Sequence, residues 1–225
     1  MRIALINSNP SWGGGERWFA EAACALLERG HEVLAVAREG SRLLERLTAV
    51  AHDAAPWEGA WARIVAPPTD VVLCNAPRDL RAVARVLPRA RAPVLVLRRG
   101  IDRPLRGGFW RRRLWRRVAM VIVNSEASGR QVRRSLPWYP AERVVRIYNP
   151  VTLDPLPREP QGDRPPRLGA VGRLTHQKGF DVLIDAVAQL DEPPGLELWI
   201  AGEGRARAAL ERRIARRGLD TRCRL

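Results

Sequence analysis

Short apolar runs alternate with segments of helical period over the first 150 residues. Runs in which nearly every residue is apolar are typical of parallel strands buried on both faces. Between the first two runs, Phe19, Ala23 and Leu26 share one helical stripe, and Gly30 follows as a stop signal. The alternation predicts an α/β domain with a doubly wound parallel sheet. The predicted strands are RIALIN (2–7), HEVLAVA (31–37), DVVLCN (70–75), PVLVL (93–97) and MVIVNS (120–125).

The pattern closes near residue 150 and restarts at residue 167. The chain between these points is proline-rich, polar and without period, as an inter-domain linker would be. We therefore expect a first domain at 1–150, a linker at 151–166 and a second domain at 167–225. The second domain shows strand patterns at 167–173, 196–202 and 221–225, and helix patterns at 179–190 and 205–217. Three strands and two helices bury little surface for an independent domain. We therefore expect the second domain to be incomplete at Leu225.

The chain carries a net charge of +15, with 39 Lys and Arg residues of which only Lys178 is a lysine. A positive field attracts polyanions such as nucleic acid or an anionic membrane. A coding preference for arginine explains the same composition without any binding partner. The balance of 46% hydrophobic and 28% charged residues is typical of a folded protein and argues against a disordered tail.

The sequence offers no pattern for a metal centre, a disulfide framework or a membrane span. The three cysteines are widely spaced and form no C-x-x-C motif, and the three histidines share no metal-ligand spacing. No apolar run approaches the ~20 residues of a membrane span, and the apolar start of the chain is too short for a signal peptide. We therefore expect a reduced, cytoplasmic protein without a metal or other cofactor.

A glycine-rich loop, NPSWGGGER, joins the first predicted strand to the first helix. Glycines allow close backbone approach, and a helix N-terminus favours anions, so Gly13 and Gly14 are candidates for anion binding. The motif alone is weak. A dinucleotide fingerprint would have glycine where Trp18 stands, and a phosphate-binding P-loop would have Lys followed by Ser or Thr. A flexible turn is the alternative.

The segment VGRLTHQKG lies at the equivalent place in the second domain. Arg173 can grip a phosphate through its planar guanidinium, and Lys178 adds a compact charge near a helix start. Together they suit a diphosphate. Two solvated loop charges are the alternative, but this alternative does not explain why lysine occurs only here.

The chain resembles the nucleotide-sugar-dependent glycosyltransferases of the retaining family 4 or group 1 type, which have two Rossmann-like domains in the GT-B arrangement. The resemblance runs along essentially the whole chain and is most specific in the second domain. It rests on GGGE (13–16), LLERGHEVLAVA (26–37), VIVNSEASGRQV (121–132), VVRIYNPV (144–151), VGRLTHQKGFDVLIDAVAQL (171–190) and LELWIAGEGRARAALERRIARRGL (196–219).

This resemblance implies sugar transfer from a nucleotide diphosphate sugar, bound between the domains, to a glycan or glycolipid hydroxyl, with retained anomeric configuration. Cations matching Arg173 and Lys178 would stabilise the charge that develops on the leaving diphosphate, without a metal. The other implied substrate-binding residues are Gly13, Gly14 and Glu16 in the first domain, and Gly202 and Gly204 near the nucleoside.

Two departures from the family pattern bear on catalysis. A pair of glutamates eight positions apart is expected further into the second domain than Leu225 reaches. A histidine after a central strand of the first domain is replaced here by the stretch VLVLRRGIDRP, with Arg98, Arg99 and Asp102. Of these, Arg99 is a candidate for holding an anionic acceptor or a donor phosphate. A non-catalytic relative that binds the donor without turnover is the alternative to an enzyme.

Residues 98–118 hold nine arginines and one acid. If residues 109–118 are helical, Trp110, Leu114, Trp115 and Val118 share one side and arginines the other. That pattern predicts a peripheral contact with the inner face of an anionic membrane, suited to a lipid-linked acceptor. A helix that packs its tryptophans inward is the structural alternative. A nucleic-acid module would use the same residues, but no recognised motif accompanies them, so we expect no specific nucleic-acid partner.

Overall fold

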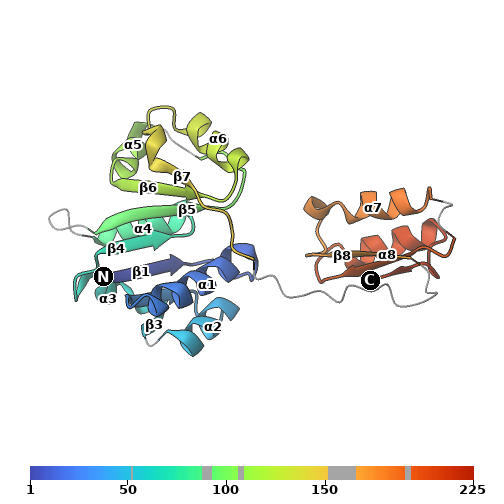
Figure 1. Ribbon diagram of the computed structural model, residues 1–225, viewed down its shortest axis with the longest axis horizontal. Coiled ribbons are helices and arrows are strands. Elements are labelled where there is room, and N and C mark those ends of the chain that lie inside the picture. The colour runs from blue at the N-terminus through green and yellow to red at the C-terminus, as the bar shows by residue number, and fades with distance from the viewer. Residues whose placement is uncertain (52, 88–92, 106–108, 152–165, 191–193) are drawn as a thin grey trace. The chain divides into compact units, whose positions relative to one another are not determined.

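The computed structural model describes residues 1–51, 53–87, 93–105, 109–151, 166–190 and 194–225. Contacts divide the chain into two compact units, Met1–Leu153 and Asp154–Leu225. The predicted linker at 151–166 lies almost wholly outside the described residues. Each unit contains a parallel sheet with helices packed on it, so the α/β fold with two Rossmann-like units is confirmed (Figure 1).

The first unit is built on a parallel sheet whose strands lie in the order β3-β2-β1-β4-β5-β6-β7. The five apolar runs predicted as strands are β1, β2, β4, β5 and β6. The short edge strands β3 and β7 complete the sheet. The strand bounds are β1 Arg2–Asn7, β2 Glu32–Ala37, β3 Asp53–Pro56, β4 Val71–Cys74, β5 Val94–Arg99, β6 Val118–Val123 and β7 Val144–Arg146.

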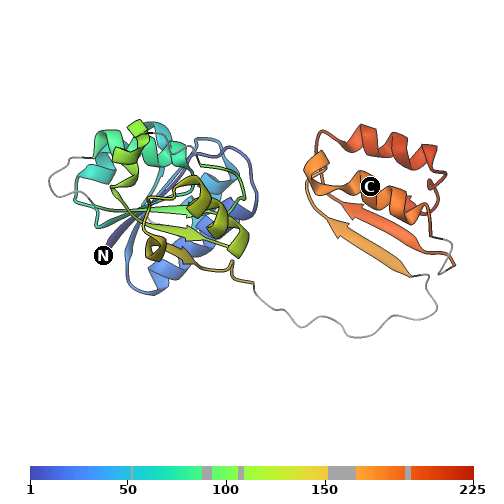
Figure 2. The same ribbon diagram turned by 90° about the horizontal axis from the view of Figure 1, so that it is seen from above.

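Helices cover both faces of this sheet (Figures 1 and 2). Phe19 of α1 and Leu43 of α2 share one buried cluster with residues of β1 and β2. Leu80 of α4 and Val132 of α6 belong to the cluster on the opposite face. The helix bounds are α1 Gly14–Glu28, α2 Arg42–Val50, α3 Trp61–Val65, α4 Pro77–Val86, α5 Phe109–Trp115 and α6 Glu126–Ser135, with short 3₁₀ turns η1 at Trp57–Gly59 and η2 at Ala141–Arg143.

The strand order reverses between β1 and β4. From β1 the chain moves outward to β2 and β3, and then crosses back to place β4 on the other side of β1. The two strands pair in parallel, with Ile6 opposite Cys74 at their carboxyl ends. A crevice forms outside the carboxyl ends of strands at such a switch point, and ligands of open α/β sheets bind there. This edge is therefore where the first unit is expected to hold a ligand.

The second unit has a parallel sheet in the order β10-β9-β8. Leu198 and Ile200 of β9 are buried together with residues of both helices, whereas Trp199, between them, is 39% exposed on the opposite face. Every element expected in this unit is present. The bounds are β8 Arg167–Val171, η3 His176–Lys178, α7 Phe180–Val187, β9 Glu197–Ala201, α8 Arg207–Arg216 and β10 Cys223–Arg224.

Candidate functional site

A buried glutamate organises the loop between β1 and α1. Glu16 is only 4% exposed, and its Oε1 accepts hydrogen bonds from Asn9 Nδ2 at 2.8 Å, Asn7 Nδ2 at 3.2 Å and Asn75 Nδ2 at 3.4 Å. Asn7 is the last residue of β1, and Asn75 directly follows β4. Glu16 thus ties together the carboxyl ends of the two strands at the switch point. The structure gives it amide partners inside the protein, whereas the resemblance implied a contact with substrate.

Arg98, near the end of β5, extends this network. Its Nη2 donates to Asn149 Oδ1 at 3.1 Å, and its Nη1 donates to Asn75 Oδ1 at 3.3 Å. The guanidinium also lies over the ring of Trp18, 4.9 Å from the centroid. Burial lowers the pKa of Arg98, and the negative charge of Glu16 opposes this shift. The carboxyl edge of the sheet therefore holds a buried positive charge that is matched by a buried negative one.

The three loop glycines have different surroundings. A Cβ on Gly15 would lie 3.4 Å from Arg98 Nη1 and 3.4 Å from Asn75 Nδ2, and one on Gly13 would lie 3.3 Å from Glu16 Oε2. A Cβ on Gly14 would meet nothing within 4 Å. Gly13 and Gly15 therefore pack against the network, and Gly14 faces open space at the N-terminus of α1. The free N–H groups and positive dipole of that terminus favour an anion.

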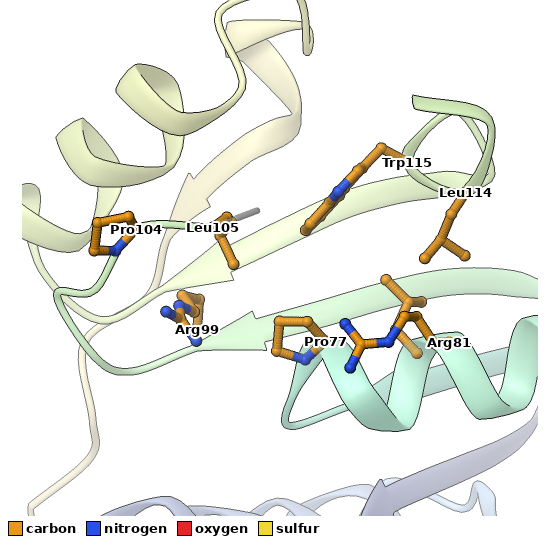
Figure 3. Close-up of a pocket in the computed structure, with 8 residues that line it drawn as sticks. Pro77, Arg81, Arg99, Pro104, Leu105, Leu114 and Trp115 are labelled. Carbon is orange, nitrogen blue, oxygen red and sulfur yellow. The ribbon is translucent and has the colours of Figure 1, made fainter. Parts of the chain in front are cut away.

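A cavity of about 280 Å³ lies on the other side of β5 (Figure 3). Arg99, the last residue of β5, is at its base, with Pro77 and Arg81 on α4 and with Trp115 on α5. Its walls carry the guanidinium groups of Arg81 and Arg99 together with apolar side chains from α4, α5 and the segment after β5. The lining residues are Pro77, Leu80, Arg81, Arg99, Pro104, Leu105, Leu114 and Trp115.

Arg99 is 8% exposed. Its Nη2 donates to the backbone oxygen of Arg103 at 2.8 Å, and its Nε has no hydrogen-bond partner among the described residues. Burial lowers the pKa of Arg99, and the charge of Arg103 lowers it further. Unlike Arg98, this guanidinium has no acidic partner in the described part of the chain.

A second cavity, of about 300 Å³, lies near the carboxyl ends of β1, β2 and β3. Beside it, Asp79 is fully buried and accepts hydrogen bonds from Ser8 Oγ and the Ala76 N–H. Burial raises the pKa of this carboxyl, and the hydrogen bond from Ser8 opposes the rise. Asp79 fixes the start of α4, as an acid in the first helical turn does. The cavity is lined by Ser8, Arg38, Trp57, Glu58 and Arg78.

In the second unit, Arg173 and Lys178 lie on the loop that follows β8, and both are exposed. Lys178 turns back along this loop, because its Cδ and Cε would lie 3.7 Å from a Cβ on Gly172. Gly179, with φ of 67°, then starts α7 in a left-handed conformation that favours glycine. Within the described ranges, neither cation is paired with a carboxylate. Both charges are thus available to a ligand.

The loop after β9 runs against this cationic loop. Gly172 N donates to Ala201 O at 3.0 Å, and Leu174 N donates to Glu203 O at 2.9 Å. A Cβ on Gly202 (φ 159°) would lie 1.8 Å from Gly172 O, and one on Gly204 (φ 158°) would lie 2.3 Å from Leu174 O. Gly202 and Gly204 are therefore required for close backbone packing, whatever they contact in a ligand.

Glu203, between these glycines, has a structural partner. Arg207 Nη2 donates to Glu203 Oε1 at 3.0 Å and to Gly202 O at 3.2 Å. The same guanidinium pairs with Glu211 at 3.4 Å. Hydrogen bonding to Glu203 is the largest cause of a raised pKa at Arg207. Arg207 thus holds the loop after β9 on the start of α8.

The basic segment differs from its expected form in one respect. Trp115 is 2% exposed and packs edge-on against Tyr139, with ring centroids 6.2 Å apart, and Val118 is buried as the first residue of β6. The interpretation in which these two residues face lipid is wrong, because Trp115 packs into the core of the first unit and Val118 belongs to β6. The alternative, a helix that packs its tryptophan inward, holds for Trp115. The Trp110 side chain lies outside the described residues. Arg112, Arg113 and Arg116 are exposed.

The described residues contain neither a membrane-spanning helix nor a cluster of metal ligands. None of the helices there combines the length and apolar character that crossing a membrane requires. No group of three His, Cys, Asp or Glu side chains in the same ranges is placed to hold a metal ion. The three cysteines are free thiols, and burial raises the pKa of Cys74 well above its usual value.

The sequence interpretation missed the asparagines that build the network. The three asparagines lie at or shortly after strand ends: Asn7 is the last residue of β1, Asn75 directly follows β4, and Asn149 lies shortly after β7. In a parallel sheet such positions meet at one edge, so polar residues just after apolar runs were the available signal. What could not be read from the sequence was that Glu16 and Arg98 connect them.

Both units match models of known glycosyltransferase families. The model described as Glycosyltransferase Family 4 matches residues 12–155, and that described as Glycosyl transferases group 1 matches residues 165–225. The lipopolysaccharide core biosynthesis glycosyltransferase LpsE of Rhizobium meliloti is 27% identical over 228 residues. That match covers 94% of this chain, and the chain spans 63% of the length of LpsE.

Solved structures share the fold at lower sequence identity. HepE of Anabaena, determined in complex with UDP and glucose, has a TM-score of 0.72 and 19% identity, covering 100% of this chain and 68% of its own. A glycosyltransferase from Rickettsia africae has a TM-score of 0.78 and 16% identity, covering 99% of this chain and 67% of its own.

Proposed function

Because the chain belongs to Glycosyltransferase Family 4, we propose that it serves in sugar transfer from a nucleotide diphosphate sugar to a hydroxyl of a glycan or glycolipid. The chain spans 63% of LpsE, so this proposal concerns the activity of the whole protein. Retention of the anomeric configuration is part of the proposal. The configuration of the transferred sugar in the product, measured by NMR, tests it.

The observation that carries the proposal is the pair of exposed cations on the loop after β8. Arg173 and Lys178 have no carboxylate partner in the described ranges, and Lys178 folds back over Gly172. Negative charge grows on the diphosphate as the sugar departs. Fixed cations that bind this charge more strongly in the transition state than in the ground state accelerate the step. We assign both residues to the leaving diphosphate.

The other donor contacts that we propose come from backbone groups. Gly14 faces open space at the N-terminus of α1, which suits an anion near Gly13 and Gly14. Gly202 and Gly204 carry no side chains beside the cationic loop, which suits contact of their backbone with a nucleoside. HepE was determined with UDP and glucose, so UDP is a reasonable first probe.

The acceptor proposal rests on the relative. LpsE acts in lipopolysaccharide core biosynthesis, which supports a glycan or glycolipid acceptor for this chain as well. Screening of nucleotide sugars and of glycan acceptors would identify the transferred sugar and the acceptor.

The decisive experiment is calorimetric titration of UDP into four forms of the protein: wild type, Arg173→Ala, Lys178→Ala and Arg212→Ala. Each cation contact contributes a charge-assisted hydrogen bond, so we expect binding to weaken about 10- to 100-fold in the first two variants. Arg212 is an exposed arginine of α8 whose side chain forms no hydrogen bond or ion pair among the described residues, and it serves as the control. Equal UDP affinity in all four forms would refute the assignment. Binding without transfer in the complete protein would identify a non-catalytic relative.

A surface contact with anionic lipid is a second proposal, favoured by the exposed Arg112, Arg113 and Arg116. Since Trp115 is buried, this contact would be electrostatic and without apolar insertion. Binding to vesicles containing phosphatidylglycerol should disappear when the three arginines are replaced by glutamate. Unchanged binding would end this proposal.

A further inference from the structure

Two consecutive arginines at the end of β5 lie on opposite faces of the sheet. Side chains alternate along a strand, so Arg98 shares its face with Val96, and Arg99 shares its face with Leu97. Arg98 reaches the amide network around Glu16. Arg99 instead lines the 280 Å³ cavity between α4 and α5 (Figure 3). The two side chains therefore require separate explanations.

Arg99 has no counter-charge among the described residues. The residue is 8% exposed, and it forms no ion pair in that part of the chain. The nearest charge that affects it is the like charge of Arg103. Residues 106–111, which follow the cavity-lining segment, contain no acid either. A buried cation without a counter-charge is costly for a fold, so a position that keeps one needs a functional reason.

A second guanidinium and the apolar walls define what the cavity can accept. Arg81 of α4 also lines it, while Leu105, Leu114 and Trp115 supply apolar surface. Two forked cations match the paired oxygens of a carboxylate or phosphate. The cavity volume of about 280 Å³ lies just below the ~300–1,000 Å³ of ligand pockets, which suits one small charged unit better than a nucleotide.

We propose that this cavity binds an anionic group of the acceptor, a carboxylate or phosphate carried on a sugar unit, with Arg99 and Arg81 as its ligands. The proposal rests on the glycosyl-transfer function proposed above and names the class of acceptor. Arg99 Nη2 already donates to Arg103 O, so Nη1 supplies the donors to the anion. The apolar wall formed by Leu114 and Trp115 contacts the carbon skeleton of the sugar.

The test is calorimetric titration of the protein with glucuronate, glucose 6-phosphate and glucose in the millimolar range. The three probes differ in the group that they carry: glucuronate has a carboxylate, glucose 6-phosphate has a phosphate, and glucose is uncharged. We expect one or both charged sugars to bind and glucose to bind far more weakly. Arg99→Met should weaken the charged probe about 10- to 100-fold, the effect of losing charge-assisted hydrogen bonds. Arg81→Gln should weaken it less, since Arg81 is the more exposed of the two.

The probe-free protein provides an independent readout. Arg99→Met removes an uncompensated buried charge and leaves an unbranched apolar chain, so its thermal midpoint should rise above that of wild type. Arg130→Met, at an exposed arginine of α6, is the matched control and should change neither the midpoint nor probe binding. A lower midpoint or an unfolded protein for Arg99→Met would instead assign the guanidinium a structural role and overturn the proposal.

Two further measurements also test the proposal: the binding of the three sugars to the wild-type protein, and the UDP affinity of Arg99→Met. Failure of both charged sugars to bind, or equal binding of glucose, would overturn the anionic acceptor. UDP affinity of Arg99→Met should equal that of wild type, because the donor cations lie in the second unit. If the wild-type protein binds UDP but neither charged sugar, the acceptor proposal fails while the proposed function stands. If the wild-type protein does not bind UDP, the proposed function fails.

Discussion

Arg98 Nη2 donates to Asn149 Oδ1 at 3.1 Å, which joins the end of the central strand β5 to the segment that leaves the first unit after β7. The same guanidinium bonds Asn75, whose amide nitrogen lies 3.4 Å from Glu16 Oε1. Four segments far apart in the sequence are thus linked at one sheet edge. The geometry of the glycine loop beside this edge depends on that network.

Glu16→Ala should destabilise the first unit by about 2–3 kcal/mol. The change removes an acceptor shared by three asparagine amides and the negative charge facing Arg98, and buried polar groups without partners are costly. Glu21→Ala is the control, since Glu21 lies on the same helix but forms only a surface pair with Arg17, worth less than about 1 kcal/mol. Urea unfolding measures both. A loss for Glu16→Ala no larger than that for Glu21→Ala would contradict the network.

Gly202→Ala should destabilise the second unit by about 3 kcal/mol, because its Cβ would overlap Gly172 O at 1.8 Å and force two backbone segments apart. Gly218→Ala isolates the conformational effect, since Gly218 has φ of 66° with nothing within 4 Å of its added Cβ. It should cost about 1–2 kcal/mol. The fluorescence of Trp199, the only tryptophan after Trp138, reports unfolding of this unit. Equal losses in the two variants would show that the close approach is unimportant.

The sequence predicts the central elements of the fold well because they carry strong patterns. The five apolar runs became strands of the first sheet, since strands buried on both faces need continuous apolar residues. The edge strand β3, Asp53–Pro56, was missed because its sequence, DAAP, has neither an apolar run nor alternation. The helix expected at 109–118 ends at Trp115, because Val118 pairs with Leu95 as part of β6.

The candidate site was harder to predict because partners distant in sequence decide the roles of its residues. Arg98 and Arg99 are identical neighbours in the sequence, yet Arg98 faces Glu16 and Arg99 faces a cavity on the other side of the sheet. Glu16 was proposed to contact substrate, and only the fold shows the asparagines that surround it. Arg173 and Lys178 were selected from a local motif and are exposed on their loop, where their donor role stays a prediction.

Lys178→Arg should bind UDP more weakly than wild type but more strongly than Lys178→Ala. The lysine stem lies over Gly172 and ends in a compact charge, whereas the planar guanidinium is bulkier and directs its donors differently. Calorimetric titration at low and high salt provides the measurement, because a charge contact that remains in the arginine variant should weaken as salt is raised. Wild-type affinity for Lys178→Arg would mean that charge alone matters at this position.

Asp185→Asn should lower the stability of the second unit at neutral pH but have little effect in strong acid. Hydrogen bonds from Arg213, at 2.9 and 2.5 Å, and from Arg217, at 2.9 Å, hold the pKa of Asp185 far below its ordinary value. An acid whose pKa falls on folding stabilises the protein above its unfolded pKa of ~3.9, and this contribution declines as the pH falls toward the folded value. Urea unfolding followed by Trp199 fluorescence at pH 7 and pH 3 should therefore show a smaller difference between variant and wild type at pH 3. Asp220→Asn, at an exposed acid that follows α8, is the control. A difference independent of pH would indicate that Asp185 acts through packing and that its charge is unimportant.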